Sequence, residues 1–444
     1  MAGYDDLSAK FRTGSVRMGV IGLGYVGLPL CIASTNAGLN VTGFDIDEAK
    51  VVALNLGLTV IRSVKDQLVK RMVQTGRFTA TGDFDKLAEM DAVLICVPTP
   101  LGHHREPDLK FVMSASEITA KTLRRGQLVI LESSTFPGTT DEVVRPILER
   151  TGLKCGEDFF LAYSPEREDP GNPVYTTSNT PRVVGADDPK SGDLAEALYG
   201  RIVTKVIRVE NSRVAEAVKI TENTFRSVNI ALMNELKVIY ARMGINIWDV
   251  IEAAKSKPFG FMPFYPGPGL GGHCIPIDPY YLTWKAKEFD IATRFVELAG
   301  DINSAMPYQV VELVADGLST VHKKGLSGAS LLLVGLAYKK NLDDLRESPA
   351  LKIWVILEKR GVKVSYYDPY IPVVPKTREY GAFADVQSIG WTKDAVGRFD
   401  AVIVTTDHDA VDYAQMTEWA QLVFDSRNAT RSLPKELKRK VILV

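Results

Sequence analysis

Hydrophobic and polar positions along the chain follow the period of buried strands in some stretches and the period of helices in others. From residue 16 to about residue 209, short apolar runs are separated by helical patterns. Five of these runs are typical of buried strands: RMGVIGLG, LNVTGFDID, DAVLICVPTP, GQLVILESS and DFFLAYSPE. Strands that alternate with helices predict a doubly wound parallel sheet.

The last part of the chain repeats this plan on a smaller scale. Beginning near Gly328, the runs ASLLLVGLAY, VKVSYYDP, FDAVIVTTD and QLVFDSRN predict strands, and residues 348–360 predict a helix. We therefore expect a second, smaller α/β domain in this region.

Two stretches between these α/β units have other patterns. Residues 211–243 carry apolar positions at helical spacing without Gly or Pro, which predicts a helix of about eight turns. A helix of this length is a candidate dimer element, although length alone does not prove an interface. Residues 257–279, KPFGFMPFYPGPGLGGHCIPIDP, are rich in Gly and Pro and predict a shaped loop that serves either function or connection.

Composition narrows the classes of protein that fit this pattern. Hydrophobic residues make up 45% of the 444 positions and charged residues 24%, which is ordinary for a globular protein and argues against disorder. The 53 basic and 54 acidic residues give a formal net charge of -1, so neither nucleic acid nor an anionic membrane is an expected partner. No apolar run approaches the roughly 18 residues of a membrane span. Residues 1–16 lack the apolar segment of a secretion signal, and we expect a cytoplasmic protein.

The first predicted strand leads into a glycine-rich turn, Gly-Leu-Gly-Tyr-Val-Gly at positions 22–27. A helical pattern and a second strand follow, and that strand ends at Asp45. Three glycines in this order allow a tight turn and close approach to a pyrophosphate, while an acid about 20 residues later bonds the ribose of NAD. A glycine turn without a ligand is the alternative. The predicted NAD contacts in this region are Gly22, Gly24, Tyr25, Val26, Gly27 and Asp45.

Hydroxyl side chains follow two other predicted strands. Thr99 lies in VPTP and Ser134-Thr135 in ESSTFPG, just beyond the carboxyl ends where open α/β sheets bind ligands. Their hydroxyl groups can contact the nicotinamide or order a water molecule. They can equally cap the helices that follow, and both interpretations stay open at this point.

The long predicted helix carries Lys219, Asn223 and Arg226 on one face, at spacing i, i+4 and i+7. An ammonium, an amide and a guanidinium group on one stripe suit an oxyanion or a phosphate. A solvated polar face is the more usual explanation for such a stripe.

The four cysteines, at positions 31, 96, 155 and 274, include no CxxC pair, which argues against a disulfide framework and a zinc site. Those at 31, 96 and 155 lie in apolar runs or a plain loop and are interpreted as packing. Cys274 instead follows Gly271-Gly272, where backbone and ligand can approach closely. A neighbouring cation such as Lys219 is needed to stabilise its reactive thiolate. His273 has no partner at ligand spacing and His103-His104 lie on a polar loop, so no metal is assigned.

Seven motifs in this order resemble the UDP-glucose/GDP-mannose dehydrogenase family: GLGYVGLP, VPTP, ESSTFPGTT, SPEREDPGNP, KITENTFRSVNIALMNE, GPGLGGHCIPIDP and GLAYKKNLDDLRESPA. The resemblance covers nearly the whole chain, and it favours function over the solvated-face explanation for the helix stripe. It implies two Rossmann-like doubly wound domains joined by a central helical domain with one long helix. The implied boundaries are 1–210 for the NAD-binding domain, 211–310 for the central dimerisation and catalytic domain, and 311–444 for the UDP-sugar-binding domain.

The resemblance also implies a four-electron oxidation of a sugar C6 hydroxyl to a carboxylate with two molecules of NAD. Cys274 then carries the thiohemiacetal and thioester intermediates. Lys219 and Asn223 stabilise the oxyanion and handle the alcohol proton. The remaining implied roles are water activation or lysine placement for Asp278, thioester hydrolysis for Glu166, water ordering for Thr135, cofactor contact for Arg346 and substrate contact for Lys339.

One motif departs from the UDP-glucose branch of the family. That branch reads roughly NPEFLAEG, whereas this chain reads SPEREDPG, with Arg167-Glu168 in place of apolar residues and Pro170 in place of the second glutamate. This form resembles the branch that acts on UDP-N-acetylhexosamines, and residues 257–272 are similar to UDP-N-acetylglucosamine 6-dehydrogenases. We expect UDP-N-acetyl-D-glucosamine as substrate and a bond from Arg167 to its acetamido oxygen. The expected substrate contacts are Arg167, Glu168, Lys219, Asn223, Arg226, Gly271 and Lys339.

Other functions stay open at this point. UDP-N-acetylmannosamine or UDP-glucose are alternative substrates, since the orientation of one hydroxyl depends on loop geometry. A two-electron hydroxyacid dehydrogenase shares the N-terminal fingerprint and the Lys219/Asn223 spacing, but it needs neither Cys274 nor residues 328–444. An inactive nucleotide-sugar sensor is a further alternative. The resemblance implies a homodimer or a higher homo-oligomer and a place in surface polysaccharide synthesis.

Overall fold

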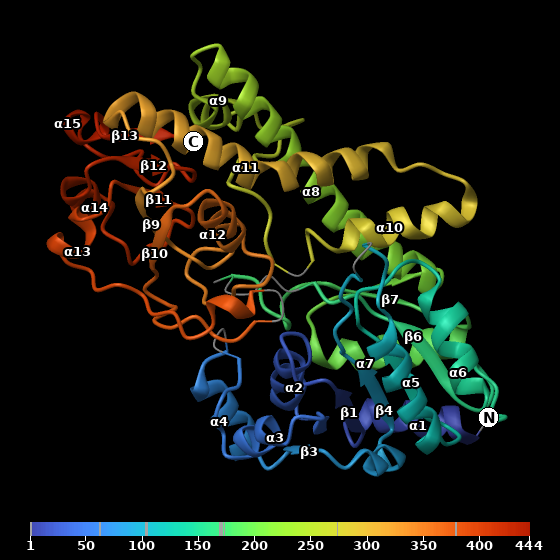
Figure 1. Ribbon diagram of the computed structural model, residues 1–444. Coiled ribbons are helices and arrows are strands. Elements are labelled where there is room, and N and C mark those ends of the chain that lie inside the picture. Colours follow the sequence, from blue (N-terminus) through green and yellow to red (C-terminus); the bar gives the residue numbers. More distant parts are fainter. Residues whose placement is uncertain are drawn as a thin grey trace. The chain divides into compact units, whose positions relative to one another are not determined.

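The computed structural model describes residues 2–61, 64–102, 105–167, 172, 174–272, 274–377 and 380–444. The chain forms two compact units, each with its own sheet (Figure 1). The first unit consists of Met1–Asn223 and Tyr280–Ala292, and the second of Thr224–Pro279 and Thr293–Val444.

The first unit contains an eight-stranded sheet in the order β3-β2-β1-β4-β5-β6-β7-β8. Its strands are β1 (Arg17–Ile21), β2 (Asn40–Phe44), β3 (Phe78–Thr81), β4 (Ala92–Ile95), β5 (Leu128–Leu131), β6 (Phe160–Tyr163), β7 (Arg182–Gly185) and β8 (Val206–Val209). All neighbouring strands are parallel except β6 and β7, which pair antiparallel. The five strands expected from the apolar runs are β1, β2, β4, β5 and β6. The predicted doubly wound parallel sheet is confirmed, and the strand order reverses between β1 and β4, where such sheets bind ligands.

Alternate residues of the central strands pack on opposite faces of this sheet, because successive side chains of a strand point to opposite sides. Ala92 and Leu94 join one hydrophobic cluster, whereas Val93 and Ile95 join the other. The first cluster lies under α1 (Ala2–Thr13), α2 (Gly27–Asn36), α4 (Asp66–Gln74) and α7 (Pro189–Ile202). The second lies under η1 (Phe84–Glu89), α5 (Lys110–Thr122), η2 (Thr139–Val144) and α6 (Arg145–Glu149). Helix α3 (Glu48–Asn55) lies beside β3.

The second unit contains a parallel five-stranded sheet in the order β10-β9-β11-β12-β13. Its strands are β9 (Ser330–Val334), β10 (Lys363–Tyr367), β11 (Ala401–Val404), β12 (Val423–Asp425) and β13 (Val441–Leu443). Helices α11 (Arg294–His322) and α12 (Pro349–Lys359) cover one face, and α13 (Lys393–Gly397) and α14 (Tyr413–Trp419) the other (Figure 1). Short helices η4 (Gly381–Phe383) and α15 (Lys435–Lys438) complete the unit. The expected second α/β domain is thus present, and its strand order reverses between β9 and β11.

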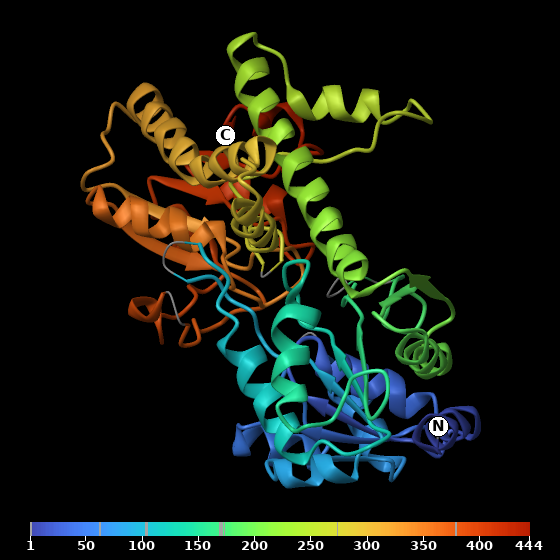
Figure 2. The same ribbon diagram turned by 90° about the vertical axis from the view of Figure 1, so that its right-hand side faces the viewer.

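The predicted long helix is α8 (Ser212–Arg242), which runs for 31 residues without a break (Figure 2). The Asn211 side chain accepts a hydrogen bond from the Val214 amide at its start, and Gly244, with φ of +72°, follows its end. Helices α9 (Ile247–Ala254), α10 (Asp278–Ala286) and η3 (Lys287–Phe289) follow. Described residues between α9 and α10 form neither helix nor strand, as the Gly and Pro content predicts.

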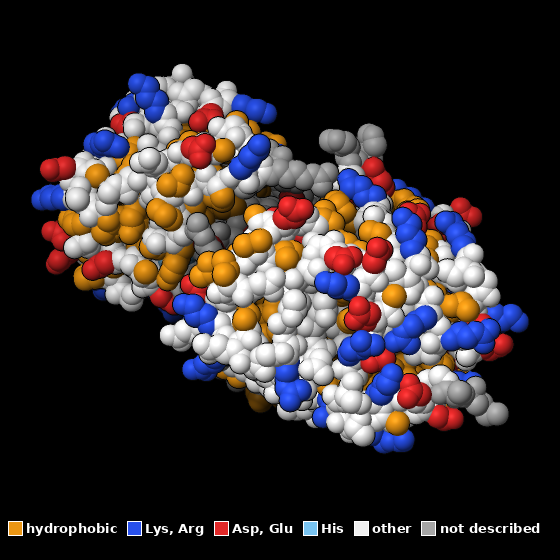
Figure 3. Space-filling view, turned by 90° about the horizontal axis from the view of Figure 1, so that it is seen from below, with side chains coloured by type: hydrophobic (Ala, Val, Ile, Leu, Met, Phe, Trp, Pro, Cys, Tyr) orange, Lys and Arg blue, Asp and Glu red, His pale blue; other side chains and the backbone are white. Residues whose placement is uncertain are grey.

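The surface matches the balanced composition. Basic and acidic side chains are interspersed over the face drawn in Figure 3. Within the described residues, every helix is too short or too polar to cross a lipid bilayer.

Candidate active site

The glycine-rich turn after β1 has the geometry of a pyrophosphate cradle. Gly22 has φ of +92°, and a Cβ atom there would lie 2.5 Å from the carbonyl oxygen of Cys96. A Cβ atom on Gly27, the first residue of α2, would lie 1.9 Å from the carbonyl oxygen of Gly22. At Gly24, by contrast, a Cβ atom would meet no described atom within 4 Å. The outer glycines are thus required by packing, and the middle one leaves room beside the helix N-terminus for a phosphate group.

Asp45 follows β2 and is the acid expected to bond a ribose. Its carboxylate accepts hydrogen bonds from the amides of Leu23 (2.9 Å) and Asp47 (3.0 Å) and from Nζ of Lys50 (2.9 Å). Burial works to raise the pKa of Asp45, but the Lys50 ammonium and the two amides outweigh it and lower that pKa below its usual value. A carboxylate has about four acceptor positions, so one remains for a ribose hydroxyl. These residues therefore fit NAD. Lys50 was not predicted, because one lysine in a helix has no distinctive sequence signal.

Hydroxyl residues after β4 and β5 are buried in the first unit. Thr135 is fully buried, and its hydroxyl oxygen has no hydrogen-bond partner among the described residues. The carbonyl of Thr99 accepts a hydrogen bond from the Tyr281 hydroxyl. Neither threonine caps a helix, since the residues before α5 and η2 are Leu109 and Gly138. A buried hydroxyl of this kind suits a contact with a ligand or an ordered water molecule.

The segment after β6 is tied to α8 by two pairs of charged residues. Nζ of Lys219 donates a hydrogen bond to the carbonyl oxygen of Glu166 (2.5 Å) and lies 3.5 Å from its carboxylate. The next residue, Arg167, binds the Glu222 carboxylate through Nε (3.4 Å) and Nη2 (2.5 Å) and the Pro181 carbonyl through Nη1 (2.8 Å). Glu222 was missed by the sequence analysis, although it lies three residues after Lys219 on the same helix.

The other residues of the predicted stripe differ in exposure. Asn223 is buried like Lys219, whereas Arg226 is exposed. Glu168 and Pro170 of the SPEREDPG motif, together with His103, His104 and His273, lie outside the described residues.

Cys274 lies in the second unit, in a loop that needs its two preceding glycines. A Cβ atom on Gly271 would lie 2.5 Å from Cβ of Tyr338, and one on Gly272 would lie 2.9 Å from the Tyr338 ring. Gly272 has φ of +85°, and its amide donates a hydrogen bond to the carbonyl of Arg346 (2.9 Å). The Cys274 loop therefore packs directly against the segment that follows β9.

Three further predicted site residues lie in the second unit, one after Cys274 and two after β9. The amide of Asp278 donates a hydrogen bond to the carbonyl of Cys274 (2.8 Å), and its fully buried side chain begins α10. The Arg346 guanidinium forms hydrogen bonds to both carboxylate oxygens of Asp344, at 2.6 to 3.0 Å. Lys339 is half-buried in the loop after β9.

The other three cysteines have the features of packing residues. Cys31 and Cys96 are buried, and burial raises the pKa of both thiols. Burial also raises the pKa of Cys155 to about 12. These thiols are protonated at neutral pH. Cys155 and Cys274 are both half-buried, but only Cys274 directly follows two glycines.

Comparisons with known proteins identify the family. Models of the UDP-glucose/GDP-mannose dehydrogenase family match three consecutive parts of the chain: the NAD binding domain over residues 16–203, the central domain over 213–305 and the UDP binding domain over 332–432. The chain belongs to the UDP-glucose/GDP-mannose dehydrogenase family. It is accordingly an NAD-dependent enzyme that acts on a UDP-sugar, and the predicted fold class, cofactor and enzyme class are confirmed.

Members of the family with similar sequences differ in the sugar that they are named for. A UDP-N-acetyl-D-glucosamine 6-dehydrogenase of Pseudomonas aeruginosa is 36% identical over 88% of this chain and 90% of that protein. An NDP-N-acetyl-D-galactosaminuronic acid dehydrogenase of Ralstonia nicotianae is 34% identical over 90% of this chain and 92% of that protein. The solved structure of the UDP-D-ManNAc dehydrogenase of Pyrococcus horikoshii has a TM-score of 0.85 at 33% identity, and the match covers 94% of this chain and 97% of that one.

Two buried carboxylates in the first unit of this family member were not predicted. Glu132, directly after β5, contacts the Arg182 guanidinium and the Tyr199 hydroxyl. Glu216, one turn before Lys219 on α8, accepts hydrogen bonds from the Gly138 amide (2.6 Å) and from the amide (2.8 Å) and hydroxyl (2.6 Å) of Thr140. Glu216 therefore fixes the backbone that follows Thr135, three and five residues later in the chain.

Proposed function

We propose that the enzyme oxidises the C6 hydroxyl of a UDP-N-acetylhexosamine, most simply UDP-N-acetyl-D-glucosamine, to the uronic acid through a thioester on Cys274. The observation that carries the proposal is the position of Cys274, half-buried directly after Gly271-Gly272, whereas burial raises the pKa of the other three thiols. Relatives named for N-acetylglucosamine, N-acetylmannosamine and N-acetylgalactosaminuronic acid support an N-acetyl sugar.

The proposed reaction converts R-CH2OH, two NAD⁺ and water into R-COO⁻, two NADH and three H⁺. NAD, when bound, accepts the hydride in both oxidations. The turn at residues 22–27 and Asp45 would hold this cofactor, with Thr99, Thr135 and Arg346 as further contacts.

In the first oxidation, the alcohol at C6 loses its hydroxyl proton as the carbonyl forms. Lys219 and Asn223 lie one turn apart on α8, so their ammonium and amide groups can both face the same oxygen. We assign them stabilisation of the developing negative charge and transfer of the alcohol proton. Glu166 holds the Lys219 ammonium in place through its carbonyl and carboxylate oxygens.

In the second oxidation, the Cys274 sulfur forms a bond to the aldehyde carbon, and the aldehyde oxygen takes a proton. The resulting thiohemiacetal loses a hydride and its hydroxyl proton and becomes a thioester. Water then attacks the thioester carbon, the carbon-sulfur bond breaks, and the thiol and the carboxylate are released. We assign Glu166 and Asp278 to water activation and Thr135 to ordering the water molecule.

Recognition of the N-acetyl group is assigned to Arg167. Contacts with described residues use three of its five N–H donors, on Glu222 and on the Pro181 carbonyl. The other two can donate to an acetamido oxygen from a guanidinium that is already fixed in orientation. Glu168, Arg226, Gly271 and Lys339 are the further proposed substrate contacts.

We also propose that the chain has three domains, at residues 1–210, 211–310 and 311–444. We propose further that two copies of the chain form a homodimer along α8. Phe225, Leu232, Ile239 and Met243 are exposed at spacings of seven, seven and four residues, which places them along one face of the helix. Exposed apolar side chains in a continuous stripe are typical of an interface between subunits. Light scattering of the intact protein measures the assembly, and Leu232→Glu should shift it toward the monomer.

The proposed reaction is tested by the amount of NADH formed per molecule of substrate. UDP-N-acetylglucosamine, UDP-N-acetylmannosamine and UDP-glucose are compared in parallel, with Cys274→Ser beside the wild type. Two NADH per N-acetyl sugar and loss of turnover in the variant are expected. One NADH per substrate, or an active Cys274→Ser variant, would place the enzyme in the two-electron class, and equal turnover of UDP-glucose would contradict the N-acetyl assignment.

A further inference from the structure

The two units share one local geometry at the point where strand order reverses. Gly22 follows β1 with φ of +92°, and Gly335 follows β9 with φ of +87°. A Cβ atom on Gly22 would lie 2.5 Å from the carbonyl oxygen of Cys96, and one on Gly335 would lie 2.4 Å from that of Thr406. Each glycine therefore lets its turn pass close to the neighbouring central strand.

Both units also have an aspartate directly after the strand that follows this turn, β2 in the first unit and β10 in the second. The Leu23 amide donates a hydrogen bond to Oδ2 of Asp45 (2.9 Å), and the Leu336 amide donates one to Oδ2 of Asp368 (2.7 Å). Asp368 is thus the counterpart of Asp45 in the second unit. The turn itself differs, since GLGYVG at 22–27 corresponds to GLAYKK at 335–340.

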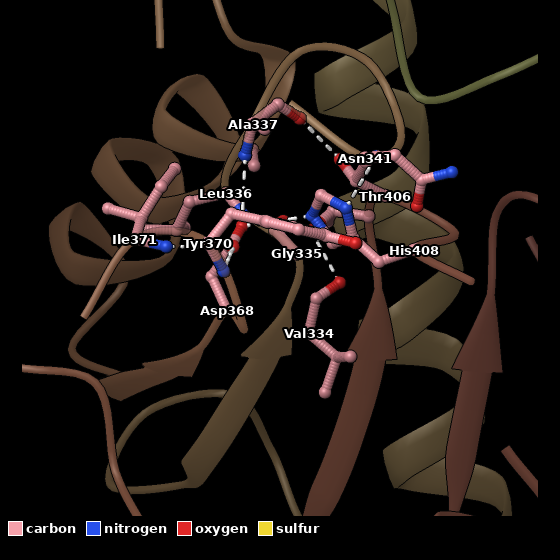
Figure 4. A network of polar contacts seen from close by, with 12 residues as sticks. Val334, Gly335, Leu336, Ala337, Asn341, Asp368, Tyr370, Ile371, Thr406 and His408 are labelled. Carbon is pink, nitrogen blue, oxygen red and sulfur yellow. Dashed lines mark hydrogen bonds and ion pairs between the residues drawn. The ribbon is translucent and has the colours of Figure 1, made fainter. Parts of the chain in front are cut away.

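Asp368, unlike Asp45, has no acceptor position left. Its carboxylate is fully buried and faces five donors (Figure 4). These donors are the amides of Leu336 (2.7 Å), Ala337 (3.3 Å), Tyr370 (2.8 Å) and Ile371 (3.1 Å) and Nε2 of His408 (3.0 Å). A carboxylate offers about four acceptor positions, so these donors occupy them all. The second unit therefore has the acid of a nucleotide-binding turn, but this acid cannot accept a hydrogen bond from a ribose hydroxyl.

His408 joins this acid to the far end of the turn. Its ring is fully buried, and Nδ1 accepts a hydrogen bond from the Asn341 amide (2.9 Å). Nδ1 therefore carries no proton in this contact, and Nε2–H donates to Asp368 (3.0 Å). One imidazole ring thus links the end of β10 to the loop after β9, from a position just after β11 (Figure 4).

The far end of the loop is held by side-chain contacts. Asn341 has φ of +61°, in the left-handed region that asparagine adopts more readily than most residues other than glycine. Its side chain donates a hydrogen bond to the Asp409 carboxylate (2.6 Å) and accepts one from the Asp409 amide (3.0 Å). Lys340 adds an ion pair with Asp409 at 3.0 Å. Together with His408, these contacts fix the second end of residues 335–341.

We propose that His408 and Asp368 are positioning residues that hold residues 335–341 in the conformation that binds the uridine diphosphate of the substrate. The inference rests on the proposed function, which places Lys339 of this loop in contact with the substrate. The loops after β9 and β11 border the reversal of strand order, where open α/β sheets bind ligands. Both residues lie within the matched UDP binding domain, residues 332–432. Tyr338, between the two fixed ends, also packs against the glycines before Cys274.

Three substitutions of His408 test the contacts of its Nδ1 and Nε2 atoms separately. His408→Phe keeps the shape and removes both contacts. His408→Gln can retain a donor near the position of Nε2, and His408→Asn can retain an acceptor near that of Nδ1. We expect the Kd of UDP to rise about tenfold in His408→Phe, as for the loss of a buried hydrogen bond, and to recover in part in the other two variants. The Kd of NAD should stay within about twofold of the wild type, because the glycine turn and Asp45 lie in the other unit and Arg346 is held by Asp344 rather than by His408.

A matched control separates positioning from general destabilisation. Thr417 is buried, and Thr417→Val removes the hydrogen bond within α14 from its hydroxyl to the Tyr413 carbonyl, without touching residues 335–341. Calorimetric binding of UDP and of NAD to each intact protein is measured beside urea unfolding. The inference is supported if His408→Phe weakens UDP binding alone while Thr417→Val leaves it unchanged.

Other outcomes overturn one proposal and not the other. Unchanged UDP affinity in His408→Phe, or equal weakening in Thr417→Val, overturns the positioning role while the proposed function stands. A wild-type enzyme that binds no UDP overturns the proposed function itself. If His408→Phe does not fold, the comparison of His408→Gln and His408→Asn with the wild type decides the matter, and wild-type UDP affinity in both overturns the inference.

Discussion

The Lys219 ammonium is held by two oxygen atoms of one residue, the carbonyl oxygen of Glu166 at 2.5 Å and its carboxylate at 3.5 Å. The backbone contact is independent of the Glu166 side chain, whereas the second contact is not. A change of that side chain therefore removes a charge beside Lys219 without removing the group that places it. This separation allows the proposed roles of the two residues to be tested independently.

Glu166→Gln should slow thioester hydrolysis while leaving both oxidations intact. Loss of a general base typically costs two orders of magnitude or more, so we expect a burst of two NADH per active site and then turnover about a hundredfold slower than the wild type. Stopped-flow absorbance measures the burst, and mass spectrometry of the quenched enzyme should find the sugar acid on Cys274.

Glu222→Gln is the matched control for this prediction. It weakens the ion pair with Arg167, the next residue of the same segment. If Arg167 recognises the substrate, the KM for the UDP-sugar should rise several-fold without a burst. A burst in both variants would show that the whole segment has moved and would contradict a specific role for Glu166.

Asp45→Ser should relax the preference for NAD over NADP. The acid lies 2.9 Å from the Lys50 ammonium, so its removal leaves a cation where a 2′-phosphate would lie. We expect kcat/KM for NAD to fall about tenfold or more and kcat/KM for NADP to rise. Steady-state kinetics with both cofactors measure the change, and Asp45→Ser with Lys50→Ala should lose the gain with NADP. A gain that persists in the double variant would contradict the role of Lys50.

Iodoacetamide should modify Cys274 well before the other thiols. Burial raises the pKa of Cys31, Cys96 and Cys155, which keeps them protonated, and Cys31 and Cys96 are also inaccessible. Peptide mass spectrometry over time measures each site, and we expect Cys274 to react at least about tenfold faster than Cys155. Saturating UDP-sugar should slow the reaction at Cys274, whereas equal rates at both sites would argue against its role as nucleophile.

The features of this enzyme that could be predicted from its sequence are those encoded by residues close together in the chain. The strand, glycine turn and acid from Arg17 to Asp45 are encoded in about 30 neighbouring residues, and the α8 periodicity is equally local. Strands β3, β7, β8 and β13 were missed, although they are no shorter than β4 and β12, which were expected. Strand β4 is apolar and buried throughout, whereas β3, β7 and β8 include polar, charged or glycine residues and β13 is only partly buried.

Contacts between distant residues had no such signal. His408 lies 40 residues from Asp368, and Glu216 lies 78 residues from Gly138. A single buried histidine or glutamate resembles an exposed one in sequence, because its partner is set by tertiary structure. Cys274 could be singled out because two glycines precede it and because its loop, GPGLGGHCIPIDP, resembles a motif of the family.

Glu216 should make stability in the first unit depend on pH. Burial raises its pKa to about 7, against the effect of the hydrogen bonds from Thr140 and Gly138. The folded state therefore binds this proton more tightly than the unfolded state, whose pKa is near 4.5. The stabilisation from this proton is complete below about pH 4.5 and is lost as the pH rises through about 7, by roughly 3 kcal/mol in total.

Glu216→Gln should remove this dependence, because the amide does not titrate. Urea unfolding at several pH values between 5 and 7.5 measures it, and the difference in unfolding free energy between variant and wild type should change by roughly 2 kcal/mol in favour of the variant as the pH rises. The glutamine side chain has one acceptor oxygen in place of two, so it accepts fewer of the hydrogen bonds from Gly138 and Thr140. The variant should therefore be the less stable protein at pH 5. Glu142→Gln, a change of a more exposed carboxylate in η2, is the control. Parallel pH profiles for wild type and Glu216→Gln would show that the Glu216 proton is not linked to folding.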